Sequence, residues 1–120
     1  MRFVGAFGPA ALVAGLGLVT LTGAASAASA EKGAIAFKKY GCWQCHGFLG
    51  QGSVATSGGK VLAPDPLPYE AFSAFVRSTN RTMPPYREAV LPESDLADIH
   101  AYLSSIPKGP DYKTIPLLNN

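Results

Sequence analysis

Apolar residues recur with the spacing of an α-helix in three segments, residues 31–40, 69–78 and 91–106. The last segment has the longest stripe, with apolar residues at i, i+3, i+7 and i+10: Leu96, Ile99, Leu103 and Ile106. A shorter stripe at i, i+3 and i+4 lies in the middle segment: Phe72, Phe75 and Val76. The pattern therefore predicts an all-α fold with about three main helices.

Residues that suit helix ends flank these segments. Glu31 favours the positive end of the first helix, and Gly41 can end that helix in a left-handed cap. Pro68 fits the first position of the second helix, and Pro92 fits the first turn of the third. Pro107 cannot continue the third helix, so we expect this helix to end there.

The first 30 residues have the composition of a secretory signal peptide. Arg2 precedes an apolar stretch over residues 4–21, and small residues then allow cleavage after Ala27 or after Ala30. The alternative is an uncleaved membrane anchor, but Pro9 and several glycines interrupt the apolar stretch. We therefore expect export to the periplasm, removal of this segment and no membrane span in the mature protein.

The rest of the chain divides into one domain, residues 31–107, and a tail, residues 108–120. Within the domain, residues 47–66 are rich in glycine and have no regular period, which predicts a long loop. In the tail, Pro110 and Pro116 disfavour a helix, so an extended conformation is expected.

The strongest chemical signal follows the first predicted helix directly, in the sequence Cys42-Trp43-Gln44-Cys45-His46. Two cysteines at this spacing with histidine next are the attachment signature of c-type haem. Cys42 and Cys45 can add to the two vinyl groups of one porphyrin, and His46 can bind the iron as the proximal ligand. The motif predicts one covalently attached haem c.

Three other interpretations of the cysteine pair are possible. A thioredoxin-like redox pair would need a βαβ context, which the helical pattern does not provide. A structural disulfide between Cys42 and Cys45 would suit an exported chain. A zinc site would need a second pair of ligands, and the sequence contains no further cysteine pair. The histidine directly after Cys45 favours haem attachment over all three.

Met83 is the candidate for the sixth iron ligand. It is the only methionine besides Met1, and Pro84 and Pro85 follow it in a segment between two predicted helices. A thioether can bind haem iron and raises its reduction potential. A buried methionine that only fills space is the alternative. His100 is the competing candidate, although a single histidine on a helix is usually partly solvated.

Charge and composition exclude some functions. Charged residues make up only 15% of the chain and the formal net charge is +2, with no basic run that would indicate nucleic-acid binding. No acid–base or nucleophilic group of residues accompanies the haem motif, so we do not expect an enzyme that acts alone. Five basic residues are candidates for a ring that steers an acidic partner, or else are scattered solvated charges: Lys38, Lys39, Arg77, Arg81 and Arg87.

With these residues placed, the chain resembles the class I c-type cytochromes, the small monohaem cytochromes of bacteria and mitochondria. The resemblance covers residues 31–107 and rests on four elements: Gly33 with Phe37, the haem motif at 42–47, Met83-Pro84, and Ala101-Tyr102-Leu103. In that family a glycine and an aromatic residue of the first helix cross an aromatic residue of the last, which implies that Gly33, Phe37 and Tyr102 meet. It also implies a small cytochrome c fold with long loops wrapped around one covalently attached haem.

The resemblance extends to the environment of the proximal histidine. The family usually places a proline soon after the motif, and its carbonyl accepts the proton of the histidine ring. Here the first proline is Pro64, so we expect the acceptor of His46 among residues 59–62, with the carbonyls of Gly59 and Lys60 as candidates.

The family carries single electrons between larger redox proteins. We therefore expect a periplasmic carrier whose partners are a dehydrogenase, an oxidase or a membrane quinol-oxidising complex, and which is a monomer or part of a heteromeric complex. One alternative is a tightly bound haem subunit of a periplasmic dehydrogenase complex. Another is a ligand-binding or sensing haem protein whose sixth coordination site opens.

Overall fold

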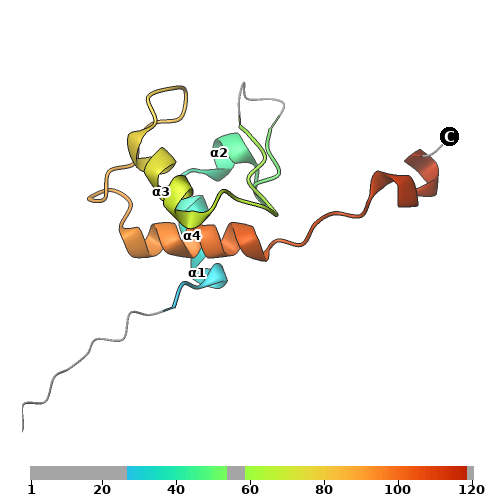
Figure 1. The fold of residues 1–120 in the computed structure, drawn as a ribbon, viewed down its shortest axis with the longest axis horizontal. Helices are drawn as coiled ribbons and strands as arrows, with labels where there is room; N and C mark the ends of the chain where they lie inside the picture. Colours follow the sequence, from blue (N-terminus) through green and yellow to red (C-terminus); the bar gives the residue numbers. More distant parts are fainter. Residues whose placement is uncertain (1–26, 54–58, 119–120) are drawn as a thin grey trace, which may run out of the picture.

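The computed structural model describes residues 27–53 and 59–118, which contain helices and no strand. Three helices of at least ten residues form the body of the protein: α1 (Ala30–Lys39), α3 (Tyr69–Ser78) and α4 (Glu93–Ser105). α4 is the longest, and the other elements of the body lie on either side of it (Figure 1). The predicted all-α class and its three main helices are confirmed.

The helices begin within two residues of the predicted positions. α1 begins one residue early at Ala30, because the Ser29 hydroxyl caps it by accepting a hydrogen bond from the Lys32 amide at 3.3 Å. Pro68 and Pro92 were expected inside the first turns of α3 and α4, and this is wrong by one position. Both are N-cap residues, because their ψ angles of 142° and 151° are extended rather than helical.

α1 and α4 cross in close contact at Gly33. A Cβ atom on Gly33 would lie 1.9 Å from the Asp98 carbonyl oxygen and 2.8 Å from Tyr102 Cβ, so the crossing has no room for a side chain there. One turn further along α1, the Phe37 ring packs against the Tyr102 ring with centroids 5.7 Å apart. The predicted meeting of the first and last helices is confirmed.

The buried core is small and lies between the three main helices. It consists of nine hydrophobic residues: Ala36, Phe37, Ala63, Phe72, Val76, Leu91, Leu96, Ile99 and Leu103. Three of the four predicted stripe residues of α4 belong to it, and the fourth, Ile106, is partly buried at the end of the helix. The helical period therefore identified the buried face of α4.

α3 buries a narrower face than predicted. Phe72 and Val76 are buried, whereas Phe75 is 50% exposed. Phe72 and Val76 are one turn apart and share the face that packs on the core, while Phe75 lies on the far side of Phe72 around the helix. The small core covers Phe72 and Val76 but not the edge of the stripe that Phe75 occupies.

The predicted extended tail is only partly correct. Residues 107–111 have no regular structure, but two short 3₁₀ helices follow, η1 (Tyr112–Thr114) and η2 (Pro116–Leu118). Pro116 opens η2, where its missing N–H group leaves no hydrogen bond unmade. This part of the chain runs away from the helical body (Figure 1).

None of the described helices is long and apolar enough to cross a membrane. The apolar stretch over residues 4–21, on which the signal-peptide prediction rests, lies outside the described residues.

Candidate haem-binding site

The haem motif is held directly behind α1. Gly41 turns the chain with a left-handed φ of 76°, as predicted, and the Cys42 amide then donates to the Phe37 carbonyl at 3.1 Å. Cys42 is the N-cap of a single turn, α2 (Trp43–His46), in which the His46 amide donates to the Cys42 carbonyl at 3.0 Å. Both cysteines and the histidine therefore share one helical turn.

The ring of His46 is fixed by the loop that follows it. Nδ1 of His46 lies 2.8 Å from the Lys60 carbonyl oxygen, which can only accept, so Nδ1 carries the proton. The acceptor therefore lies within residues 59–62, as expected, and it is one of the two carbonyls proposed. In this tautomer Nε2 keeps its lone pair and can bind a metal ion, and the hydrogen bond at Nδ1 raises the basicity of the ring.

Gly59 allows the loop to come this close to the motif. A Cβ atom on Gly59 would lie 1.5 Å from the Cys45 carbonyl oxygen, so only glycine fits at this point. The Gly52 amide donates to the His46 carbonyl at 2.8 Å, and the Ser53 amide donates to the Gly59 carbonyl at 3.1 Å. The loop therefore leaves and rejoins the motif through backbone contacts, and residues 54–58 between them are outside the described part.

Cys42 and Cys45 are not joined by a disulfide. Cys45 is exposed, whereas Cys42 is partly buried, and burial raises the pKa of the Cys42 thiol to about 11. The structure does not form the disulfide that was one alternative. Within the described residues no group of three or more His, Cys, Asp and Glu side chains is placed to hold a metal ion, so the zinc alternative lacks a ligand set there. Two thiols and an oriented imidazole on one turn are the donor set that haem c requires.

Met83 lies in the segment between α3 and α4. It is partly buried and packs against the hydrophobic core that Cys42 also contacts. The hydroxyl of the buried Thr79 is 3.4 Å from the Met83 carbonyl oxygen, and the Tyr86 hydroxyl donates to the Tyr40 carbonyl at 2.9 Å. The segment that carries Met83 is therefore tied to the chain just before the haem motif.

His100, the competing candidate, is engaged elsewhere. Its Nε2 atom lies 2.8 Å from the Leu67 carbonyl oxygen, and its ring meets Tyr69 and Phe72 edge-on, with centroids 5.4 and 5.3 Å away. These contacts place it between α3 and α4. A ring nitrogen that donates to a carbonyl has no lone pair to offer a metal ion.

Among the five basic residues that are candidates for a ring, two pair with acidic residues of α4. Arg77 Nη2 lies 2.7 Å from Glu93 Oε2, and the Arg77 side chain is only 20% exposed. Lys39 Nζ lies 3.6 Å from Asp95 Oδ2. Arg77, whose guanidinium points into the protein, therefore does not fit the candidate ring, and Lys39 pairs with Asp95.

Some contacts at the site gave no signal in the sequence. Thr79 and Arg77 are polar residues at the end of α3, and only the folded chain shows that they contact the segment that carries Met83. The ring of Trp43, inside the motif, stacks on the Phe48 ring with centroids 4.6 Å apart. These contacts depend on where the loops return, which neither helical period nor motif spacing determines.

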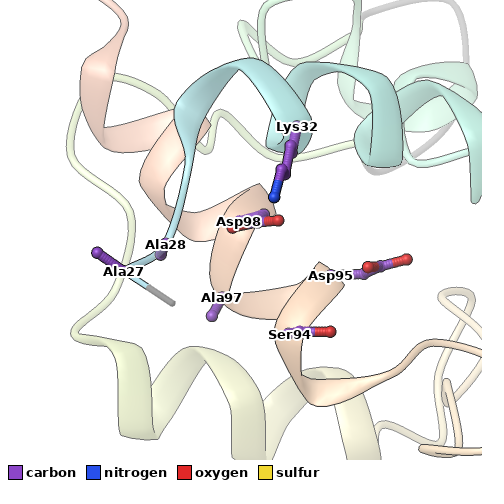
Figure 2. Close-up of a pocket in the computed structure, with 7 residues that line it drawn as sticks. All are labelled: Ala27, Ala28, Lys32, Ser94, Asp95, Ala97 and Asp98. Atoms are coloured by element: carbon purple, nitrogen blue, oxygen red, sulfur yellow. The ribbon is translucent and has the colours of Figure 1, made fainter. Parts of the chain in front are cut away.

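A shallow cavity of about 200 Å³ lies apart from the motif, beside the start of α1 (Figure 2). Residues from the N-terminal segment, α1 and the first turns of α4 line it: Ala27, Ala28, Lys32, Ser94, Asp95, Ala97 and Asp98. It contains no cysteine, histidine or methionine, so it is not part of the candidate haem site.

The helical fold and the motif on α2 together define the c-type cytochrome class. The family model described as cytochrome c oxidase, cbb3-type, subunit III matches residues 28–103, and the chain belongs to this family. No curated protein and no solved structure matched the chain. The protein accordingly has a small all-α cytochrome c fold, carries covalently bound haem c with its iron, and takes part in haem-based electron transfer.

Proposed function

We propose that this protein is a periplasmic one-electron carrier whose haem c is attached through Cys42 and Cys45 and whose iron is bound by His46 and Met83. The observation that carries the proposal is the 2.8 Å contact between His46 Nδ1 and the Lys60 carbonyl. This contact fixes the ring tautomer that a proximal ligand needs, on the same turn as both thiols.

The residues around the proposed ligands suit electron transfer. Haem c held by these residues would supply one-electron redox chemistry between a reduced partner and an oxidised partner. His46 is held by its hydrogen bond and Met83 by a segment tied to Tyr40, and these contacts support a site in which both ligands would be kept in the two oxidation states. Fixed ligands keep reorganisation small, and a thioether ligand raises the reduction potential.

The same contacts weigh against a sensor whose sixth site opens. The Thr79 hydroxyl and the Tyr86 hydroxyl hold the Met83 segment at two points, and Pro84 and Pro85 stiffen it. A methionine held in this way would keep the sixth position filled most of the time and would disfavour binding of a gaseous ligand or a substrate.

A second candidate is a stable haem subunit of a larger redox complex, such as a dehydrogenase or an oxidase. The description of the family favours it, because it names an oxidase subunit. The tail also favours it, since Leu117 is 86% exposed and Leu118 is 61% exposed in a segment outside the family match.

The visible spectrum of the ferric holo-protein tests the proposal. We expect the weak far-red band of a sulfur–iron bond in the parent and its loss in Met83→Ala, together with a lower reduction potential in the variant. His100→Ala is the matched control, and it should keep the band. A parent spectrum that is low-spin without the band, or high-spin, would contradict the assignment of Met83.

A further inference from the structure

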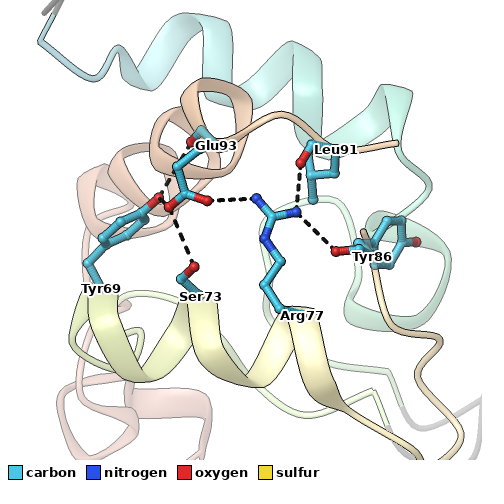
Figure 3. Close-up of polar contacts among 6 residues, drawn as sticks. All are labelled: Tyr69, Ser73, Arg77, Tyr86, Leu91 and Glu93. Carbon is cyan, nitrogen blue, oxygen red and sulfur yellow. Dashed lines mark hydrogen bonds and ion pairs between the residues drawn. The ribbon is translucent and has the colours of Figure 1, made fainter. Parts of the chain in front are cut away.

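Arg77 makes three hydrogen bonds that converge on the connection between α3 and α4. Its Nη1 atom donates to the Tyr86 carbonyl at 3.0 Å and to the Leu91 carbonyl at 2.7 Å, and its Nη2 atom donates to Glu93 Oε2 at 2.7 Å (Figure 3). The Arg77 side chain is 20% exposed, so water competes little for the bonds to the two carbonyls, whereas the bond to Glu93 is exposed because the Glu93 side chain is 49% exposed. One side chain thus bonds to the connection at Tyr86 and Leu91 and to Glu93, the first residue of α4.

Two backbone hydrogen bonds to α3 flank the segment that carries Met83. Before Met83, the amide of Thr79, the C-cap residue of α3, donates to the Phe75 carbonyl at 2.9 Å. After it, the Tyr86 amide donates to the Val76 carbonyl at 2.9 Å. Residues 80–85 therefore form a closed loop on the end of α3, and Arg77 bonds to Tyr86, the residue at which that loop closes.

Glu93 holds the guanidinium in place. Its Oε1 atom accepts hydrogen bonds from the Tyr69 hydroxyl and from the Ser73 hydroxyl, both on α3, while its other oxygen receives Arg77 (Figure 3). The hydrogen bonds from Tyr69 and Arg77 lower the pKa of Glu93, so it is ionised at neutral pH. Burial and Glu93 raise the pKa of Tyr69 to about 12, so its hydroxyl remains a donor.

We propose that Arg77 is a positioning residue that keeps the Met83 segment closed over the sixth iron position and thereby sets how readily the sulfur is replaced by another ligand. The proposal rests on the function proposed above for Met83. Only a planar fork with several donors can serve two carbonyls and one carboxylate together, so lysine should replace Arg77 poorly.

The thermodynamic basis is a competition between closed and open forms of the segment. An external ligand binds the iron only when the sulfur has left, so its apparent affinity is its intrinsic affinity multiplied by the open fraction. Loss of the three Arg77 bonds destabilises the closed form relative to the open one. Each factor of ten in the open fraction corresponds to about 1.4 kcal/mol.

The test is a titration of the ferric holo-protein with imidazole. Binding is measured by the decrease of the far-red band. We expect Arg77→Gln to bind imidazole at least about tenfold more tightly than the parent. Arg77→Lys should lie closer to Arg77→Gln than to the parent. Arg87→Gln is the matched control, because it removes the same charge from an exposed position on the same connection and should leave imidazole affinity unchanged.

Stability measurements separate positioning from a general structural role. If Arg77 only stabilised the fold, Arg77→Gln would lower the denaturation midpoint and leave imidazole affinity within about twofold of the parent, which would overturn the proposal. If Arg77→Gln does not accumulate, Glu93→Gln gives the second measurement, since it removes the charge that holds the guanidinium and should tighten imidazole binding in the same direction.

The experiment distinguishes an error in the proposed function of Met83 from an error in the proposed role of Arg77. A parent without the far-red band would refute Met83 as ligand, and this inference with it. A parent that has the band and an Arg77→Gln variant that binds imidazole like the parent would refute the role of Arg77 alone.

Discussion

At the scale of single residues, Gly59 is the position near the proposed haem site that has the least room for a side chain. The backbone of Gly59 touches the Cys45 carbonyl, and the next residue, Lys60, presents its own carbonyl to His46. The side chain of Lys60 takes no part in that hydrogen bond. The environment of His46 is therefore determined by backbone position, which a side chain at residue 59 would change.

This gives a prediction for Gly59→Ala. The added Cβ atom must displace the backbone, because it would otherwise lie 1.5 Å from the Cys45 carbonyl oxygen. We expect the Lys60 carbonyl to move away from His46, which makes the ring a weaker electron donor and raises the reduction potential. We also expect the free energy of unfolding to fall by about 1–3 kcal/mol.

A redox titration and a denaturant curve measure the two effects. Lys60→Ala is the control: it keeps the backbone carbonyl, so both quantities should match those of the parent. An unchanged potential in Gly59→Ala would show that the hydrogen bond survives the substitution or does not tune the iron.

At the scale of elements, Ser29 joins the start of α1 to α4. Its amide donates to Asp98 Oδ1 at 2.6 Å, and its hydroxyl caps α1. Cleavage of a signal peptide after Ala30 would remove both contacts, whereas cleavage after Ala27 would keep them. The family match also begins at residue 28.

We therefore predict that the mature protein begins at Ala28. The intact mass of the holo-protein from a periplasmic extract measures this directly, and a mature protein that begins at Glu31 would contradict it. Ser29→Ala should lower the free energy of unfolding by about 1 kcal/mol, because the cap is lost. Ser94→Ala makes the same change of residue type at an exposed position of α4, away from this cap, and is the comparison.

The elements also show what the sequence allowed us to predict. The period of Leu96, Ile99 and Leu103 gave the helix and its buried face, because burial of one face requires that spacing. Motif chemistry identified the haem turn and limited the acceptor of His46 to a few carbonyls. The bonds of Arg77 could not be predicted, because they join a helix to carbonyls 9 and 14 residues away whose direction depends on the fold.

At the scale of the whole molecule, the described tail and the helical body are distinct. The nine buried core residues lie between Ala36 and Leu103, so none comes from the tail. The core is thin for an independent domain, and the haem would add a large apolar body for side chains to pack on.

We accordingly expect removal of residues 108–120 to leave the visible spectrum and the denaturation midpoint of the holo-protein unchanged. Both quantities are measured on the truncated and full-length proteins side by side. A lower midpoint would show that the tail packs on the body. If a larger redox subunit co-purifies with the full-length protein and is lost on truncation, the protein is a subunit and not a free carrier.

If the chain is exported, as proposed above, the crossing of α1 and α4 has a consequence for the order of events during export. Ser29 and Asp98, which bond across it, are 69 residues apart in sequence. A chain that enters the periplasm with its N-terminus first presents the haem motif well before α4 arrives. The two thiols would thus stay open to the enzymes that attach haem, and the last helix to emerge would close the domain around the finished cofactor.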